Sequence, residues 1–256
     1  MEWATLREEI AARAGEIGDL LRAAPSGATP VAGLEWSVGE LGAHLVSVPR
    51  RYVRMISEPT PFPEQLSALN EAEILAVGTT DPQDLAGLLR SETAVLLDVL
   101  GDDGDGSVPF FGMQHTAAGV GGIMLGELLL HGLDLARSLG RPWVVRPDQA
   151  IAVTRGLVSV LPHSVDHEVA AHATGTYHLR LRGGDDWTFL VRDGQVTAEQ
   201  RRPARADVHV SADPVAFLLV GYGREPRWKA LLRGRMVGWG RKPWLATRFS
   251  RLFVET

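Results

Sequence analysis

The sequence predicts two domains of different class, an N-terminal four-helix bundle and a small C-terminal α+β domain. Apolar residues recur at helical spacing through roughly the first 160 residues, and from about residue 168 they alternate as they do in strands. Long helices without a strand pattern favour an up-and-down bundle with additions. The fold class is therefore α followed by α/β, and the predicted domains are residues 1–162 and 168–256.

Helix start and stop signals divide the first domain. Ser37 and Glu40 have the spacing of a capping box, and the helix that they begin carries His44 on its apolar face before Pro49 perturbs it. His44 should therefore point inward. The predicted helices are residues 3–23, a second that begins at residue 37, and residues 64–76, 82–99, 115–139 and 147–161.

The second domain shows short alternating segments separated by turn residues. Asp193-Gly194 predicts a two-residue hairpin turn, and Asp213-Pro214 predicts a helix start. The predicted strands are residues 176–182, 187–192, 195–200, 207–211 and 236–239, and further helices are expected at 228–232 and 243–253.

Composition restricts the chemistry. Of 256 residues, 45% are hydrophobic and 22% are charged, as in an ordinary globular protein, and none is cysteine. Disulfides and cysteine-ligated metals are excluded, so any thiol must come from outside. The acidic N-terminus is unlike a secretion signal, and no eighteen consecutive residues are apolar. We expect a cytoplasmic protein without a membrane span.

Charge is unevenly distributed. Residues 1–195 carry 14 basic and 26 acidic side chains, whereas residues 196–251 carry 12 basic and 4 acidic ones. The basic segment could face nucleic acid, an anionic lipid surface, a small anion or the acidic half of the chain. The basic residues are interleaved with Trp, Leu and Phe, which favours the small anion or the acidic half, and we expect no nucleic-acid partner.

Glu127 and His131 have the spacing of metal ligands. Four residues apart, they share one helix face, and that face is otherwise apolar. A buried carboxylate needs compensation, and an antiparallel bundle can bring the inward-facing His44 beside it. Three N/O ligands leave positions open, as in a catalytic metal site. The alternative is that His44 is an ordinary core histidine and that Glu127 and His131 form a hydrogen bond within their own helix.

Two motifs resemble the mycothiol-dependent maleylpyruvate isomerase family. One runs from Trp36 to His44-Leu45, and the other is Glu127-x-x-x-His131-Gly132-x-Asp134-Leu135-Ala136. The segments 206–214 and 231–240 are similar to that family's sterol-carrier-protein-like domain. The resemblance implies a DinB-like metal-binding bundle, with His44, Glu127 and His131 as ligands of a divalent metal, Zn²⁺ by expectation, and mycothiol as the thiol.

The resemblance also implies a reaction. A metal would lower the pKa of the thiol, and the thiolate would add to an electrophile, giving cis-trans isomerisation of a maleylpyruvate-like diacid or release of a thioether by S-transfer. An arginine of the second domain would hold a substrate carboxylate; Arg224 is the best match and Arg235 the second. The competing class is a lipid or small-anion binding protein with a non-catalytic metal site.

Other conspicuous residues have simpler explanations. Asp134 could orient His131 or lie in solvent. Gly119, Gly121 and Gly122 fit close helix packing better than a phosphate loop. We expect His115 not to be a ligand, and we expect a solvated linker rather than a metal site at the histidines His163, His167 and His172.

Overall fold

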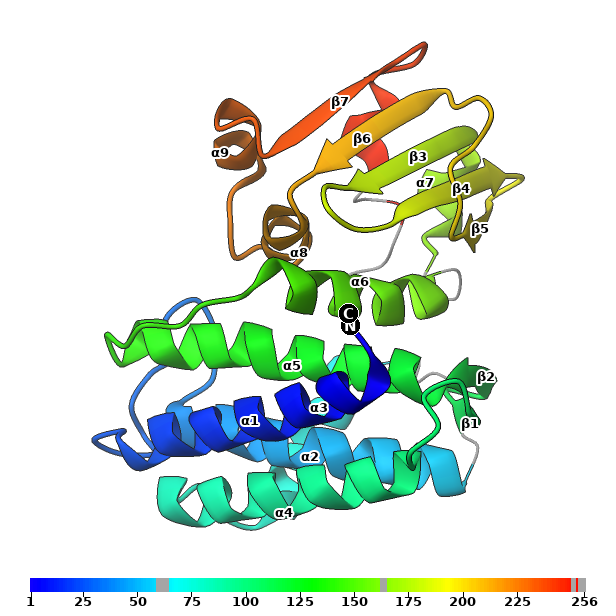
Figure 1. The fold of residues 1–256 in the computed structure, drawn as a ribbon. Coiled ribbons are helices and arrows are strands. Elements are labelled where there is room, and N and C mark those ends of the chain that lie inside the picture. The colour runs from blue at the N-terminus through cyan, green and yellow to red at the C-terminus, as the bar shows by residue number, and fades with distance from the viewer. Residues whose placement is uncertain (59–64, 162–164, 250–251, 253–256) are drawn as a thin grey trace. The chain divides into compact units, whose positions relative to one another are not determined.

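The computed structural model describes residues 1–58, 65–161, 165–249 and 252. The chain divides into two compact units, Met1–Val144 and Val145–Thr256. The first unit is built of helices with one small hairpin, and the second combines helices with a five-stranded sheet (Figure 1). The predicted fold class is confirmed.

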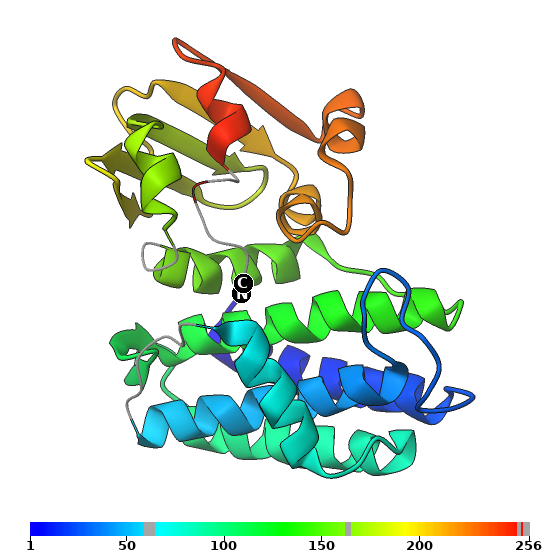
Figure 2. The same ribbon diagram turned by 180° about the vertical axis from the view of Figure 1, so that it is seen from behind.

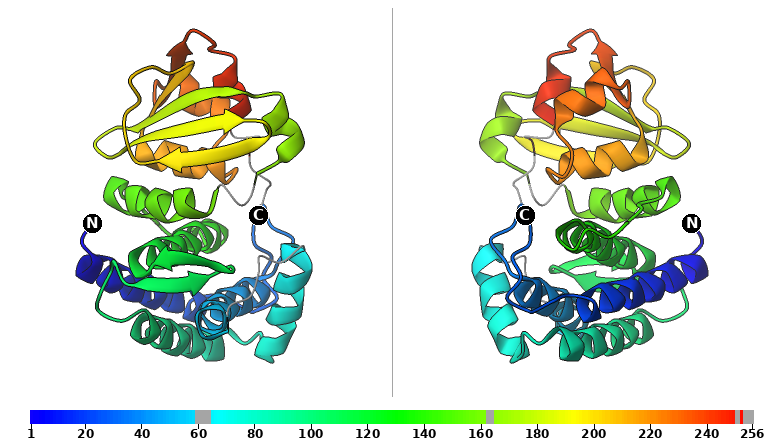
Figure 3. Two further views of the ribbon diagram at one scale, coloured as in Figure 1. Left: turned by 90° about the vertical axis from the view of Figure 1, so that its right-hand side faces the viewer. Right: turned by 90° about the vertical axis from the view of Figure 1, so that its left-hand side faces the viewer.

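Four long helices of the first unit enclose one core. α1 packs against α4 and α5, and α2 packs against the same two helices, so the four form a closed ring, which Figure 3 views from one end. α3 packs on the outside of α2 (Figure 2). The elements are α1 (Trp3–Arg22), α2 (Val38–Ser57), α3 (Leu66–Val77), α4 (Pro82–Leu100), β1 (Ser107–Phe110), β2 (Met113–Thr116) and α5 (Ala117–Ser138).

The start of α2 follows the sequence prediction. The Ser37 side chain accepts a hydrogen bond from the backbone N–H of Glu40, and the Glu40 carboxylate accepts one from the backbone N–H of Ser37. Pro49, which the sequence predicts to perturb the helix, lies inside α2, and α2 continues to Ser57. The part of α2 beyond Pro49 carries Arg51 next to the candidate site.

α5 is the most buried helix of the first unit. It begins at Ala117, two residues later than predicted, because residues 113–116 pair with residues 107–110 as a hairpin. By length and mean hydropathy α5 could cross a membrane, but 78% of the qualifying window is buried inside the protein. Packing in the bundle accounts for its apolar composition.

A mixed sheet forms the centre of the second unit. Its strand order is β5-β4-β3-β6-β7, with β3 and β6 parallel and the other neighbours antiparallel. The strands are β3 (Gly175–Leu181), β4 (Asp186–Arg192), β5 (Gln195–Glu199), β6 (Val208–Ala212) and β7 (Met236–Gly240). The helices are α6 (Pro147–Val160), α7 (His167–Ala171), α8 (Pro214–Gly221), α9 (Arg227–Leu232) and α10 (Leu245–Arg248).

The two faces of the sheet differ. Tyr177, Leu179 and Phe189 point into a core that α7 and α10 cover (Figure 2), and the alternate residues of each strand point to the opposite face. α7 was not predicted. The predicted helix over 243–253 is α10, and the last part of that prediction, including Phe253, lies outside the described residues.

α6 belongs to the second unit. Ile151 and Val158 pack on the core of that unit, and Arg155 forms an ion pair with Asp185 at 2.6 Å between nitrogen and oxygen. The two compact units therefore divide after Val144, earlier in the chain than the predicted domain boundary between residues 162 and 168. The predicted domains, residues 1–162 and 168–256, stay a prediction.

Candidate metal centre

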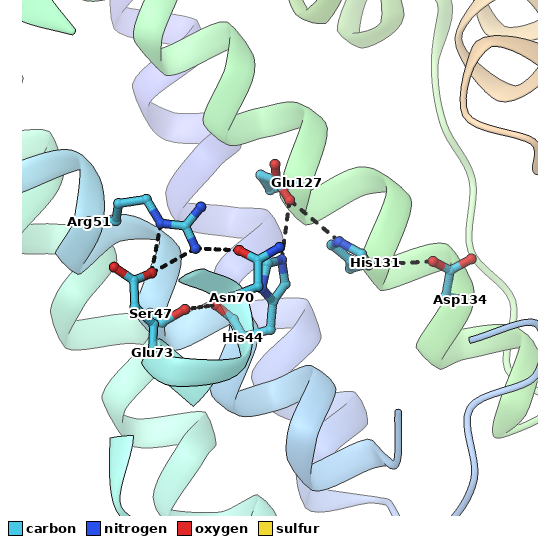
Figure 4. A network of polar contacts seen from close by, with 8 residues as sticks. All are labelled: His44, Ser47, Arg51, Asn70, Glu73, Glu127, His131 and Asp134. Atoms are coloured by element: carbon cyan, nitrogen blue, oxygen red, sulfur yellow. Dashed lines mark hydrogen bonds and ion pairs between the residues drawn. The ribbon is translucent and has the colours of Figure 1, made fainter. Parts of the chain in front are cut away.

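The three predicted ligands lie together in the first unit. α2 supplies His44, and α5 supplies Glu127 and His131 from successive turns (Figure 4). Oε2 of Glu127 lies 3.6 Å from Nε2 of His44 and 3.4 Å from Nε2 of His131. One ligand atom from each residue can be chosen so that all three lie within 4.8 Å of one another.

These separations fit a shared metal ion. Ligands about 2.1 Å from a tetrahedral zinc ion lie about 3.4 Å from one another, close to both measured distances. The same distances are too long for good hydrogen bonds. Buried polar groups are normally hydrogen-bonded, and the side chains of His44 and Glu127 are only 5% and 30% exposed. Two imidazoles and one carboxylate are also a donor set typical of catalytic zinc.

Charge and protonation suit a cation here. Burial raises the pKa of Glu127, but its contacts with His131 and His44 outweigh burial and hold that pKa well below its usual range. Burial also lowers the pKa of His44, which keeps the imidazole neutral and its lone pair available. The centre therefore presents an ionised carboxylate and a neutral ligand at neutral pH.

Asp134 lies behind His131. Its Oδ2 is 3.5 Å from Nδ1 of His131, on the opposite side of the ring from Glu127. Burial lowers the pKa of His131, but Asp134 and Glu127 more than compensate and raise it overall. At 3.5 Å the contact is an electrostatic one rather than a hydrogen bond, and a carboxylate in this position favours the ring orientation in which Nε2 faces the ligand set.

Tight packing explains the glycine that follows His131. A Cβ on Gly132 would collide with the indole of Trp143, which donates a hydrogen bond to the carbonyl of Leu129 at 3.0 Å between nitrogen and oxygen. Gly121 is similar, since a Cβ there would lie 2.7 Å from the ring of Trp3. Close helix packing, as predicted, accounts for Gly121.

Two residues at the site were not predicted. The Trp36 ring lies over both histidines, 4.8 Å from the His44 ring centre and 6.2 Å from that of His131. Arg51 follows His44 by two helical turns and is buried. Trp36 stands inside a motif quoted from the sequence, and the seven-residue spacing of Arg51 from His44 is the signal that could have located it.

Arg51 is held in place from α3. It donates hydrogen bonds to Glu73 at 2.7 Å and to Asn70 at 2.5 Å, and Glu73 also pairs with Arg54 (Figure 4 shows Arg51, Asn70 and Glu73). Two arginines share one carboxylate, so this wall of the site carries a net positive charge. Burial is the main reason that the pKa of His44 is lowered, His131 adds to it, and the guanidinium of Arg51 makes a smaller contribution in the same direction.

The remaining candidates lie elsewhere. Arg224 is in the second unit, where its guanidinium donates to the backbone carbonyl of Tyr222 at 2.7 Å. Arg235 is engaged by Asp213 and Glu225 in two ion pairs of 2.7 and 2.9 Å, so it serves its own unit. Arg224 as a substrate ligand stays a prediction.

Among the described residues, no further histidine is grouped with His44, Glu127 and His131 as a potential ligand. His115 is buried on β2 beside Phe110. His167 contacts the backbone carbonyl of Gly194 through Nδ1, and His172 follows α7. His163 lies outside the described residues.

Comparison with known proteins decides the family. The family model of the mycothiol maleylpyruvate isomerase N-terminal domain matches residues 5–136, more than half of the chain. The chain belongs to the mycothiol maleylpyruvate isomerase family. The SCP-2 sterol transfer family matches residues 159–253. Both matches confirm the resemblance that the sequence motifs suggested.

Solved structures of mycothiol-dependent maleylpyruvate isomerase share the fold of this family member. One crystal structure matches with a TM-score of 0.53 and 16% identity, over 89% of this chain and 91% of that one. A histidine-to-alanine mutant of a mycothiol-dependent maleylpyruvate isomerase matches with the same score and identity, over 88% and 90% of the two chains. Sterol Carrier Protein 2 Like 2 from Aedes aegypti is similar over 41% of this chain and 98% of its own, at 16% identity and a TM-score of 0.35. No curated protein matches the sequence.

Proposed function

We propose that this protein is a metal-dependent enzyme that uses mycothiol to act on a small electrophile. The observation that carries the proposal is the convergence of His44, Glu127 and His131 on one point, at separations that suit a metal ion better than hydrogen bonds. Family membership supports the thiol and the isomerase class.

Each residue has a defined task at such a centre. Bound zinc would act as a Lewis acid that lowers the pKa of a thiol at neutral pH. His44 and His131 would hold the ion through Nε2, and Glu127 would offset part of its charge. Asp134 would orient His131 from behind the ring. Trp36 covers the histidine rings and limits the access of water.

The substrate side of the proposal is a maleylpyruvate-like diacid, which undergoes cis-trans isomerisation, or an electrophile that accepts the thiol in S-transfer. Both reactions need the same activated sulfur, so the metal ligands serve either. In the isomerase, Arg224 would hold a substrate carboxylate, because a guanidinium pairs with a carboxylate through two parallel hydrogen bonds. A cytoplasmic location is part of the proposal.

The experiment has two readouts. Zinc added to chelator-treated protein should raise its melting temperature, because a ligand that binds only the folded state stabilises it. Incubation with mycothiol and a panel of electrophiles should then give adducts by mass or isomerisation by absorbance. Purified protein with less than about a tenth of an equivalent of metal, together with an unchanged melting temperature, would contradict the proposal.

A second candidate function follows from the match of residues 159–253 to the SCP-2 sterol transfer family. In that case the second unit would hold a lipid or a small anion, and the metal would only stabilise the bundle. Native mass spectrometry that finds a copurified lipid, with no turnover of thiol and electrophile, would favour this binding protein over the enzyme.

A further inference from the structure

Helix α9 turns its apolar face outward. Trp228, Leu231 and Leu232 are 64%, 50% and 81% exposed, whereas Ala230 is fully buried. Positions i, i+3 and i+4 share one face of a helix, so these three side chains form a single apolar surface, here called the α9 face. Since exposed apolar area costs free energy in proportion to its size, a contiguous face of this kind indicates a binding surface.

Positive charge flanks the α9 face. Lys229 and Arg233 lie four residues apart on the adjoining side of the helix, and neither has an ion-pair partner among the residues that the structure describes. Residues 226–249 contain no acidic side chain. Of the seven basic residues of that segment, three are paired with carboxylates outside it: Arg235 with Asp213 and Glu225, and Arg241 and Lys242 with Asp207. The other four are Arg227, Lys229, Arg233 and Arg248.

Further exposed aromatic residues follow α9 in the sequence. Arg227 donates a hydrogen bond to the carbonyl of Thr247 at 3.2 Å, which places the start of α9 beside α10. β7, the edge strand that follows α9 (Figure 1), exposes Trp239, and Trp244 precedes α10. Six of the ten most exposed large apolar side chains in the described part of the chain fall within residues 228–244. The apolar exposure is therefore concentrated in one stretch of the sequence, and the α9 face is the part of it that lies on a single helix face.

We propose that the α9 face docks on an anionic lipid surface. A short apolar helix face bordered by Lys and Arg is the arrangement of a helix that lies in the headgroup layer. Trp favours that layer, and Lys229 and Arg233 would be attracted by anionic headgroups. The proposal concerns a location for the enzyme and does not depend on the chemistry of the metal centre.

Two other occupants fit less well. A symmetric dimer through this surface would bring Lys229 and Arg233 close to their own copies, where like charges repel. Single-stranded nucleic acid would use Trp228 as a stacking surface, but Leu231 and Leu232 offer no ring on which a base can stack. Lipid is the occupant that uses the leucines, Trp228 and the cations of α9 together.

Cosedimentation of the full-length protein with vesicles tests the proposal. Vesicles of phosphatidylcholine with phosphatidylglycerol should bind the protein, pure phosphatidylcholine should bind it much less, and salt should weaken the binding. The double variant Trp228→Ser, Leu232→Ser should bind at least about tenfold more weakly, because the burial of one Leu side chain in the lipid alone changes affinity by about tenfold. Lys229→Gln and Arg233→Gln should each weaken binding about fivefold.

Leu75 provides the matched control. It is 81% exposed, as Leu232 is, but lies on α3 close in sequence to Glu71 and Glu73. Leu75→Ser should therefore keep the wild-type binding, and all variants should keep the wild-type melting temperature because the substituted side chains are exposed. If the double variant melts at a lower temperature than the wild-type protein, the vesicle binding of Lys229→Gln and of Arg233→Gln tests the proposal instead.

Four results would overturn the proposal. The first is no binding of the wild-type protein to the anionic vesicles, and the second is an equal loss of binding in Leu75→Ser and in the double variant. The third is a wild-type dimer that becomes a monomer in the double variant, which would assign the α9 face to a second copy of the chain. The last is binding of labelled single-stranded RNA that the same variants abolish.

Discussion

The bundle and the sheet each hold two histidines beside one carboxylate, yet the two sets differ in geometry. In the bundle, Nε2 of His44 and Nε2 of His131 both face Oε2 of Glu127 at 3.6 and 3.4 Å. On the sheet, the contacts run in a line: Oδ1 of Asp186 lies 2.5 Å from Nε2 of His178, whose Nδ1 lies 2.9 Å from Nδ1 of His209.

The difference shows what makes a metal site. The three sheet residues satisfy one another through short hydrogen bonds, and His178 uses both of its ring nitrogens, so no group of lone pairs is left pointing at a common centre. The three bundle residues converge without good hydrogen bonds, and they are the one set of three potential ligands identified among the described residues. Two histidines and a carboxylate are therefore not enough to make a metal site; their lone pairs must also point at a common centre.

The largest expected effect is the loss of metal binding in Glu127→Gln. This change keeps the size of the side chain but removes its negative charge and one ligand oxygen. Because even an outer partner of a ligand contributes about 10- to 100-fold to metal affinity, we expect a loss of more than about 100-fold. Equilibrium dialysis with zinc measures it.

Asp186→Asn is the matched control on the sheet. It should keep the wild-type zinc affinity while it lowers the free energy of unfolding by about 1.5–3 kcal/mol, the contribution of a hydrogen bond to a charged group. Unchanged zinc affinity in Glu127→Gln, or a large loss in Asp186→Asn, would reverse the assignment of the two clusters.

Asp134→Asn should have a smaller effect. Asp134 stands behind His131 as Asp186 stands behind His178, but only His131 faces a metal site. We expect zinc affinity to fall by about 10- to 100-fold, as for other carboxylates that orient a histidine ligand. The same dialysis, with the melting temperature of the metal-free protein as a check on folding, measures this loss. A wild-type affinity would show that packing alone holds the His131 ring.

Most of the fold could be predicted from the sequence because its signals are local. Asp193-Gly194 forms the predicted hairpin turn, with φ values of 50° and 73°. Phe111-Gly112 forms a turn of the same kind, with φ values of 51° and 73°, but it was missed. Asn or Asp favours the first position of this turn and Phe does not, so only tertiary contacts such as the packing of Phe110 on Tyr52 explain the missed hairpin.

The site was predictable where its spacing lay within one helix. Glu127 and His131 are four residues apart, and helical geometry alone puts them on one face. The approach of α2 was inferred, and the hold of α3 on Arg51 through Glu73 and Asn70 could not be, since nothing local in the sequence pairs residues 19 and 22 positions apart. Contacts between helices are set by the packing of the whole bundle.

The smallest expected effect concerns pH and the sheet cluster. Burial, followed by the neighbouring His178 and Arg202, lowers the pKa of His209 below its ordinary value of 6.5. The unfolded chain therefore binds a proton at a higher pH than the folded protein does, so the contribution of His209 is fully present above pH 6.5 and is lost as the pH falls below it. His209→Gln should make the fall in unfolding free energy between neutral and mildly acidic pH shallower, as urea titrations at several pH values would measure. Equal slopes for variant and wild type would mean that the hydrogen-bonded line on the sheet is indifferent to proton uptake, and the contrast with the bundle would then rest on zinc affinity alone.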